Sequence, residues 1–190
     1  MRFHKDDRGT RYCDIFPEIG KGDINITIVE PHAAALWHRH KFQSDWQFVV
    51  KGSLKVGVCN LPQYKDEDFA RYPQQMVDFI EESKKEWTNT YKPIYQKSLK
   101  NYENISIGKL TNKKVAMVFG DEPQCHWHYL SEHNANEGAL FIPSGLWHGC
   151  YNYTNEPAIL AYHITNKWDG SDEERVHPLK MGWNYEREVK

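Results

Sequence analysis

Three histidines and one aspartate have the residue types and spacing of groups that bind metals or transfer protons. His38 and His40 lie in the segment Trp37-His38-Arg39-His40, Asp45 follows five residues later, and His148 lies far downstream in the segment 143–152. Residues i and i+2 of a β-strand point to the same side, so the two imidazoles of the first segment can face one interior. An imidazole can also act as a general acid or base near neutral pH.

The chain around these residues has the pattern of short β-strands. Ile24, Ile26 and Ile28 alternate with other residues, which places one apolar face on a strand. The run 48–50 leads through Gly52 into alternating apolar positions at 54–58, which predicts a hairpin. Further short β-rich segments are 115–119, 140–142 and 159–164. Together they predict an all-β sandwich or barrel.

One segment, about residues 66–101, has a helical pattern instead. Apolar residues recur there near the helical period, at Met76, Phe79, Ile80, Trp87 and Tyr91. We expect a helical insertion bounded by Pro73 and Pro93, because proline interrupts the hydrogen bonding of a helix.

The composition is that of one globular domain. The chain has 190 residues, of which 39% are hydrophobic and 26% charged, and a net charge of −2. A charge this close to zero argues against a nucleic-acid partner. The four cysteines form no C-x-x-C pair and are expected to be reduced. Because no secretory signal and no membrane span is recognisable, we expect a single domain over residues 1–190, located in the cytoplasm and without a membrane partner.

The two histidine segments resemble the paired motifs of the cupin superfamily, in which His-x-His, an acidic residue and a distant histidine line a small β-barrel. The second segment carries the matching residues Pro143, Gly145, His148 and Asn152. The first segment has Asp45 in the acidic position, and His32 stands where a glycine is usual. The resemblance implies a cupin barrel, a jelly-roll of the double-stranded β-helix type, that carries the helical insertion.

A narrower resemblance, to the dTDP-4-dehydrorhamnose 3,5-epimerase family, covers most of residues 1–60 and 115–185. The motifs that carry it follow the family's order: Asp7-Arg8-Gly9, Leu130-Ser131-x-x-Asn134, the run from Leu140 to Gly149, Tyr162-x-x-Thr165, and His177-Pro178 with Gly182-Trp183. Members of this family are cupins that act on nucleotide-linked 4-keto-6-deoxyhexoses. The resemblance implies an isomerase that inverts C3, or C3 and C5, in deoxysugar and lipopolysaccharide O-antigen biosynthesis, without a cofactor.

The same resemblance implies roles for individual residues. Inverting a carbon next to a ketone requires a base that removes the α-proton and an acid that returns a proton to the opposite face. His40 matches the family's catalytic base, and Tyr162 matches its general acid. Arg8 would hold the nucleotide diphosphate, and Arg39 lies near the family's phosphate-binding arginine but is displaced from it. The other residues expected to bind substrate are His38, Gln43 and His148.

Two departures from the family point to different chemistry. His177 stands where the family has the aspartate that pairs with its base, and Asp45 stands where it has a lysine that steadies the enolate oxygen. A divalent metal held by His38, His40, Asp45 and His148 would supply a Lewis acid in place of that lysine. His40 would then be a ligand rather than a free base. A metal-free epimerase and a metal-dependent cupin, of dioxygenase or ketoisomerase type, are therefore alternatives. In a third arrangement Asp45 pairs with a histidine and raises its basicity.

The partners implied by the resemblance are a nucleotide-diphosphate sugar and a second copy of the chain. In such a homodimer the N-terminal strand crosses to the neighbour, so that Arg8 would serve the partner's pocket. The helical insertion has no counterpart in the family's pattern. It could cover the mouth of the barrel, build the dimer interface or lie on the surface.

Overall fold

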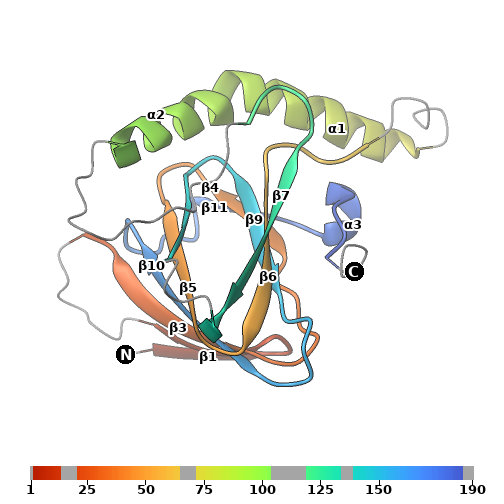
Figure 1. Cartoon of the computed structure of the whole chain (residues 1–190). Coiled ribbons are helices and arrows are strands. Elements are labelled where there is room, and N and C mark those ends of the chain that lie inside the picture. The colour runs from red at the N-terminus through yellow and green to blue at the C-terminus, as the bar shows by residue number, and fades with distance from the viewer. Residues whose placement is uncertain (1, 14–20, 65–71, 104–118, 134–138, 186–190) are drawn as a thin grey trace.

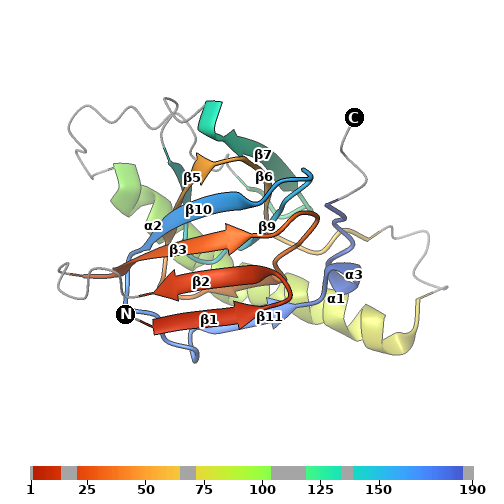
Figure 2. The ribbon, with the colours of Figure 1, turned by 90° about the horizontal axis from the view of Figure 1, so that it is seen from below.

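Two antiparallel β-sheets face each other in the computed structural model, which describes residues 2–13, 21–64, 72–103, 119–133 and 139–185 (Figure 1). The first sheet has six strands in the order β1 (Arg2–Asp6), β2 (Gly9–Cys13), β3 (Asp23–Val29), β10 (Ala158–Ile164), β5 (Asp45–Lys51) and β8 (Leu140–Ile142). Figure 2 shows most of this sheet from below, with β1 at its edge. The second sheet has five strands in the order β11 (Glu173–Val176), β4 (Trp37–His40), β9 (Trp147–Tyr151), β6 (Ser53–Cys59) and β7 (Cys125–Ser131).

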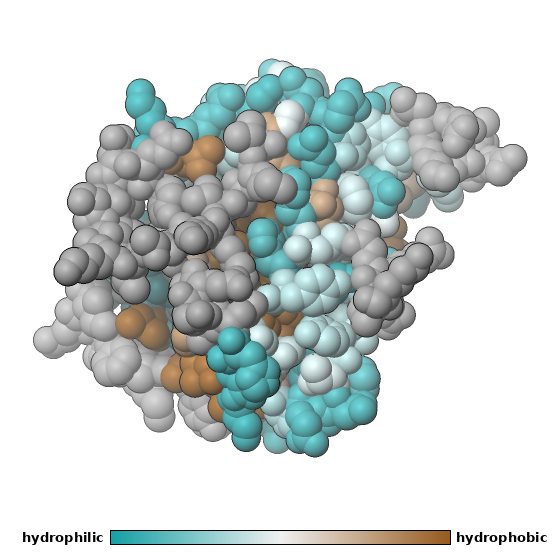
Figure 3. All heavy atoms as spheres, viewed as in Figure 1, coloured by the Kyte–Doolittle hydropathy of each residue, from teal (hydrophilic) through white to brown (hydrophobic). Residues whose placement is uncertain are grey.

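The space between the sheets holds both a hydrophobic core and a cavity lined by polar and apolar side chains. Leu54, Val56 and Val58 of β6 are fully buried against residues of the other sheet, such as Leu140. The alternation along β3 predicts the strand correctly, but the face turned inward is the polar one, which includes Asn25. Ile24, Ile26 and Ile28 therefore face away from the cavity. Figure 3 shows hydrophobic side chains at the lower left, over β3 in the view of Figure 1.

The hairpin predicted across Gly52 is wrong. The strands on either side of it, β5 and β6, belong to different sheets and do not pair with each other. Gly52 has φ 78°, a left-handed conformation that glycine adopts without strain, and it forms the corner at which the chain passes from one sheet to the other. Alternation along two consecutive strands does not reveal whether they pair, so the pattern could not distinguish a hairpin from a corner.

The helical insertion is confirmed for its described part. It consists of α1 (Gln74–Glu86), a π-helical turn η2 (Trp87–Tyr91) and α2 (Lys92–Glu103), which follow one another without a break and lie along one side of the sheets (Figure 1). Pro73 precedes the first turn as predicted, but Pro93 does not end the helix. It is the second residue after the π-helical turn, where the i→i−4 hydrogen bonding is already interrupted, so its missing N–H is tolerated.

The other predicted strands have mixed outcomes. Segments 140–142 and 159–164 lie within β8 and β10, as expected. Residues 115–118 of the predicted strand 115–119 lie outside the described residues, as do 66–71 of the predicted insertion. Strand β11 was not foreseen, because its sequence Glu173-Glu174-Arg175-Val176 is charged rather than apolar. Across the parts of the chain described, none of the helices combines the length and apolar character that a membrane crossing requires.

Buried aromatic side chains of the insertion pack on the turn that precedes β9. Trp87, Tyr91 and Tyr95 belong to the same core cluster as Leu146. Gly145 in this turn has φ 91°, and its backbone N–H donates to the His40 carbonyl oxygen at 2.7 Å. The insertion thus contacts the segment that leads into His148.

The substitution Gly145→Ala is expected to lower the free energy of unfolding by about 2 kcal/mol or more. An added Cβ would lie 2.7 Å from the Tyr91 carbonyl oxygen, and the positive φ is strained for alanine. Urea denaturation measures the change. The matched control is Gly120→Ala, where an added Cβ has no atom within 4 Å. Equal stabilities of the two variants would contradict this account of the turn.

Candidate metal and substrate site

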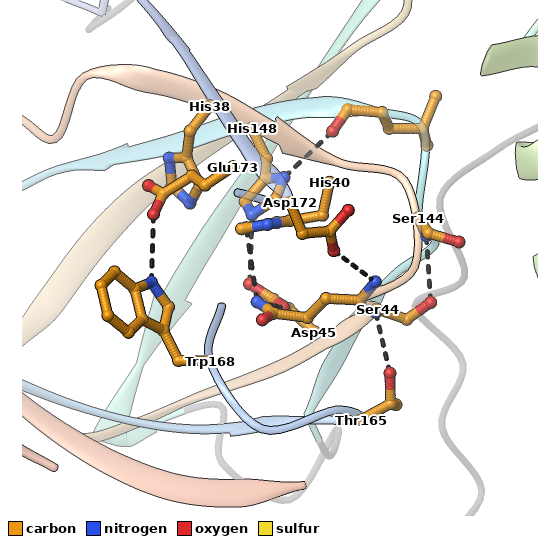
Figure 4. A network of polar contacts seen from close by, with 12 residues as sticks. His38, His40, Ser44, Asp45, Ser144, His148, Thr165, Trp168, Asp172 and Glu173 are labelled. Atoms are coloured by element: carbon orange, nitrogen blue, oxygen red, sulfur yellow. Dashed lines mark hydrogen bonds and ion pairs between the residues drawn. The ribbon is translucent and has the colours of Figure 1, made fainter. Parts of the chain in front are cut away.

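Three strands and both sheets bring the predicted histidines and aspartate together. His38 and His40 come from β4, and His148 of β9 is the direct cross-strand partner of His38. Asp45 comes from the first position of β5 in the other sheet. One ligand atom from each of the four residues lies within 4.8 Å of the others, and Figure 4 shows the side chains pointing toward one another. We call these four residues the ligand set.

Backbone carbonyl groups orient two of the imidazoles. His38 Nδ1 lies 3.0 Å from the Leu36 carbonyl oxygen, and His148 Nδ1 lies 3.1 Å from that of Leu146. A carbonyl oxygen can only accept, so each Nδ1 carries the proton and donates it. The Nε2 atoms are left to face the ligand set, which is how second-shell contacts orient metal-binding histidines.

Asp45 is a buried carboxylate, with 2% of its surface exposed. It accepts a hydrogen bond from Gln43 Nε2 at 2.8 Å and lies 3.1 Å from His148 Nε2. Burial alone would raise the pKa of Asp45, but the hydrogen bond to His148 and the charge interactions with the three histidines together outweigh it and lower the pKa to about 2. Burial alone would lower the pKa of His148, but the contact with Asp45 raises it. The carboxylate is therefore charged and requires a cation beside it.

The geometry of this contact fits a metal ion. Because His148 Nδ1 already holds a proton, its Nε2 can face the Asp45 carboxylate only if a second proton or another cation lies between them. His40 Nδ1 is buried and has no hydrogen-bond partner in the part of the chain that the structure describes. Three imidazole nitrogens and one carboxylate suit zinc, iron or manganese. The residues present fit a divalent cation.

The other two histidines are neutral at pH 7. Burial lowers the pKa of His38 to about 3, and the neighbouring histidines add to the effect. Burial also lowers the pKa of His40, although Asp45 partly offsets this. A neutral imidazole can either coordinate a metal or accept a proton. Both alternatives drawn from the sequence therefore remain chemically open to His40.

The ligand set opens into a cavity of about 450 Å³ between the sheets. Most of the predicted site residues line it: Arg8, His38, His40, Gln43, Asp45 and Tyr162. His148 lies directly behind them and is buried. None of the described residues of the helical insertion lines the cavity. Within that part, the insertion packs beside the barrel instead of covering the cavity.

Arg39 does not lie where we expected a substrate-binding residue. It alternates with His38 and His40 on β4, so its side chain points out of the cavity toward the helical insertion. The guanidinium pairs with Glu86 of α1 and, at 2.7 Å, with Glu174 of β11. It also lies 3.5 Å from the centroid of the Tyr91 ring, a cation–π contact. With 1% of its surface exposed, Arg39 joins the insertion to the histidine-bearing strand.

Further residues, which the sequence did not single out as functional, lie at the mouth of the cavity. Glu173 and Arg175 of β11 are the cross-strand partners of His40 and His38, so they point inward with them. Glu173 accepts a hydrogen bond from Arg175 Nε at 2.6 Å. It also accepts one from Trp168 Nε1 at 3.2 Å (Figure 4). Burial alone would raise the pKa of Glu173, but the hydrogen bonds from Arg175 and Trp168 and the charge interactions with Arg175 and His38 together outweigh it, and the pKa falls to about 2. The charged composition of β11 was the signal available in the sequence.

A carboxylate from the same region holds the loop between β4 and β5. The backbone N–H groups of Lys41, Phe42 and Gln43 donate to Asp172 at 2.9 to 3.2 Å. Ser44 N–H donates to Thr165 Oγ1 at 2.9 Å (Figure 4). These bonds fix the segment that carries Gln43 to Asp45.

The structure explains why His177 stands where the epimerase family has an aspartate. Its Nδ1 accepts a hydrogen bond from the Leu179 N–H at 3.2 Å, which caps the short helix α3 (Pro178–Met181). His177 is exposed and is not among the cavity-lining residues. The residue that pairs with a histidine in this site is Asp45, in accord with the arrangement considered from the sequence.

Replacing His148 with alanine is expected to abolish the binding of one Zn²⁺ or Mn²⁺ per chain, because it removes one of the four ligands. Elemental analysis after incubation with the metal and gel filtration gives the stoichiometry, and circular dichroism checks the fold. The matched control is His133→Ala, because that side chain is 87% exposed. Wild-type protein without bound metal, or equal metal content in both variants, would count against the site.

Comparison with known proteins shows the fold. No family model matches the chain, and no curated protein matches it. Among solved structures, the capsular polysaccharide assembling protein CapF from Staphylococcus aureus is 12% identical with a TM-score of 0.55; the match covers 93% of this chain and 31% of CapF. The chain thus spans about a third of that protein.

A second structure matches over most of both chains. The dTDP sugar isomerase from Desulfovibrio desulfuricans G20 is 13% identical with a TM-score of 0.52, and the match covers 96% of this chain and 85% of the isomerase. Sequence identities of 12% and 13% show a shared fold but no shared activity. With the two facing sheets and the helices beside them, they show that the chain has an all-β cupin fold with a helical insertion.

Proposed function

We propose that this protein is an isomerase that moves protons at the carbons next to the ketone of a nucleotide-linked 4-keto-6-deoxyhexose, inverting C3 or both C3 and C5. The observation that carries the proposal is that the ligand set adjoins one cavity, which Tyr162 also lines. The similarity in fold to a dTDP sugar isomerase and the ordered motifs of the epimerase family support it.

We further propose that the active protein holds a divalent metal at the ligand set. A bound divalent ion would act as a Lewis acid that polarises the ketone oxygen of the substrate. His38, His40 and His148 would offer imidazole nitrogens, and Asp45 would offer a carboxylate oxygen. Gln43, which donates to Asp45, orients that carboxylate. A metal bound beside Asp45 would take the role of the lysine that the epimerase family carries at that position of its sequence motif.

Proton transfer requires groups on different sides of the substrate. Tyr162 lies on β10 of the six-stranded sheet, whereas His40 and Glu173 lie on the five-stranded sheet. We assign to the Tyr162 hydroxyl the return of a proton to the ring. In the metal-dependent scheme we assign removal of the α-proton to the Glu173 carboxylate, which lines the cavity and is the cross-strand partner of His40. In the metal-free alternative His40 takes that proton, and its neutral state favours this role.

Arginines at the mouth suit the diphosphate of the substrate. Arg8 lies at the turn between β1 and β2 and lines the cavity of its own chain. Its guanidinium lies 2.5 Å from Asp6, and Arg175 is similarly paired with Glu173. A phosphate group would compete with these carboxylates for the guanidinium groups, which bind phosphate in a bidentate manner.

The homodimer remains a prediction. One surface that suits it is the outer face of the six-stranded sheet, where Ile24, Ile26 and Ile28 of β3 lie beside Ile159 and Ala161 of β10. An apolar sheet face of this kind is typical of an interface between two copies of a chain.

Solvent exchange tests the proposed function. Protein incubated in D₂O with dTDP-4-keto-6-deoxyglucose is expected to introduce deuterium at C3, or at C3 and C5, as followed by NMR or mass spectrometry. Exchange that is lost after chelation and restored by one equivalent of metal would support the metal-dependent scheme, whereas exchange that survives chelation would support the metal-free one. If the ring takes up no deuterium under either condition, the proposed function is wrong.

Two substitutions separate the proposed roles. His40→Asn is expected to abolish exchange, since it removes either a ligand or the base. Tyr162→Phe is expected to retain exchange at the α-carbon but to lower the yield of inverted product by about a hundredfold or more. Product stereochemistry and deuterium content measured on the same sample distinguish the two effects. Full inversion by Tyr162→Phe would exclude this tyrosine as the acid.

A further inference from the structure

We propose that Gln47 binds a substrate hydroxyl group on a carbon next to the ketone, and so makes the site selective for α-hydroxy ketones. This inference rests on the proposed function and adds to it a specificity-determining residue on a different strand from the histidines. Three features carry it: the position of Gln47, its hydrogen bonding and the polarity of its neighbours.

Gln47 lies on β5 two residues after Asp45, so both side chains point to the same face of the sheet. It lines the cavity, and 6% of its surface is exposed. Tyr162 is its direct cross-strand partner on β10. The Cβ atoms of such a pair lie about 5 Å apart, and residues two apart on a strand are about 7 Å apart. Gln47 therefore lies between the ligand set and the proposed acid.

The amide oxygen of Gln47 is buried and accepts no hydrogen bond from the residues that the structure describes. Its other cross-strand neighbour, Leu140 of β8, has an apolar side chain that offers no donor. A buried polar atom without a partner is costly, and most such atoms in native proteins are paired. The oxygen itself is covered in this conformation, but the Gln47 side chain lines the cavity, so rotation of its terminal amide would present the oxygen to a donor on a ligand.

The neighbours of Gln47 indicate the chemistry of that ligand. Asn25, Tyr162 and Gln47 lie side by side in register across β3, β10 and β5, and all three line the cavity. None of these side chains is a cation, so this row is not suited to a phosphate or carboxylate. Amides and a phenol donate and accept hydrogen bonds, which suits neutral hydroxyl groups. A ligand with its ketone at the ligand set and its α-carbon facing Tyr162 would direct the hydroxyl on that carbon to Gln47.

The test compares ligands with and without that hydroxyl. Binding of dTDP-4-keto-6-deoxyglucose and its 3-deoxy counterpart, which lacks the hydroxyl next to the ketone, to metal-loaded protein is measured by calorimetry. Wild-type protein is expected to prefer the hydroxylated sugar by about ten- to a hundredfold, because the deoxy sugar leaves the buried amide unpaired. Gln47→Met, which keeps the length of the side chain, is expected to lose most of this preference. Gln74→Met, the same change on the exposed start of α1, should leave it unchanged.

A second pair of ligands keeps the inference testable if the nucleotide sugars do not bind. Hydroxyacetone and butanone differ in the same α-hydroxyl group, and their binding to Mn²⁺-loaded protein can be followed by paramagnetic NMR relaxation. Absence of nucleotide-sugar binding together with a preference for hydroxyacetone that Gln47→Met removes would refute the proposed function but support the role of Gln47. A Gln47→Met variant that discriminates as well as wild type, or a wild type that shows no preference in either pair, would overturn the inference.

Discussion

The buried charge of Asp45 is the constraint on which the rest of the site depends. A carboxylate removed from water is stable only beside positive charge or strong hydrogen-bond donors. Asp45 comes from one sheet, and the histidine that faces it comes from the other. The contact therefore joins the two sheets at the end of the cavity and makes the position of the imidazoles depend on a cation, whether a proton on His148 or a metal ion. This same requirement explains why Gln43 donates to the carboxylate and why Asp172 and Thr165 hold the loop that carries it.

The two faces of β4 make different contacts, one with the cavity and one with the helical insertion. The inward face presents His38 and His40 to the cavity, and the outward face presents Arg39 to Glu86, Glu174 and the ring of Tyr91. The Arg39 charge is buried and its carboxylate partners are partly exposed, so losing a partner would leave a buried charge uncompensated, and the helical insertion is thereby tied to the strand that bears the histidines. The insertion also contacts Gly145, whose N–H donates to the His40 carbonyl. Along its described part it supports the site from behind the sheet, without entering the cavity.

The cavity combines a reactive end with a polar wall. The three imidazoles of the five-stranded sheet face Asp45, Gln47 and Tyr162 of the six-stranded sheet. Ion pairs of arginines with carboxylates lie at the mouth of the cavity. Such a division suits a ligand that must be polarised at one atom, exchange protons at the next and be held by its remaining hydroxyl groups. It also accounts for the inverted polarity of β3: Asn25 and Thr27 face the interior because that interior is a binding cavity at this level, while the isoleucines face outward.

The sequence by itself determined the elements whose signals are local. The period-two alternation predicted β3 and β10, the helical period predicted the insertion, and the spacing of His38 and His40 placed both on one face. The distant His148 and Asp45 could be joined to them only through resemblance to the cupin motifs. Tertiary structure decided what depends on partners far along the chain. Gly52 turned out to be a corner between sheets, and Arg39 was directed away from the cavity by the carboxylates of α1 and β11. Glu173, Arg175 and Gln47 became cavity residues only when β11 and β10 paired with β4 and β5. Alternation shows that two residues share a face, but which face meets a cavity depends on the pairing of the whole sheet.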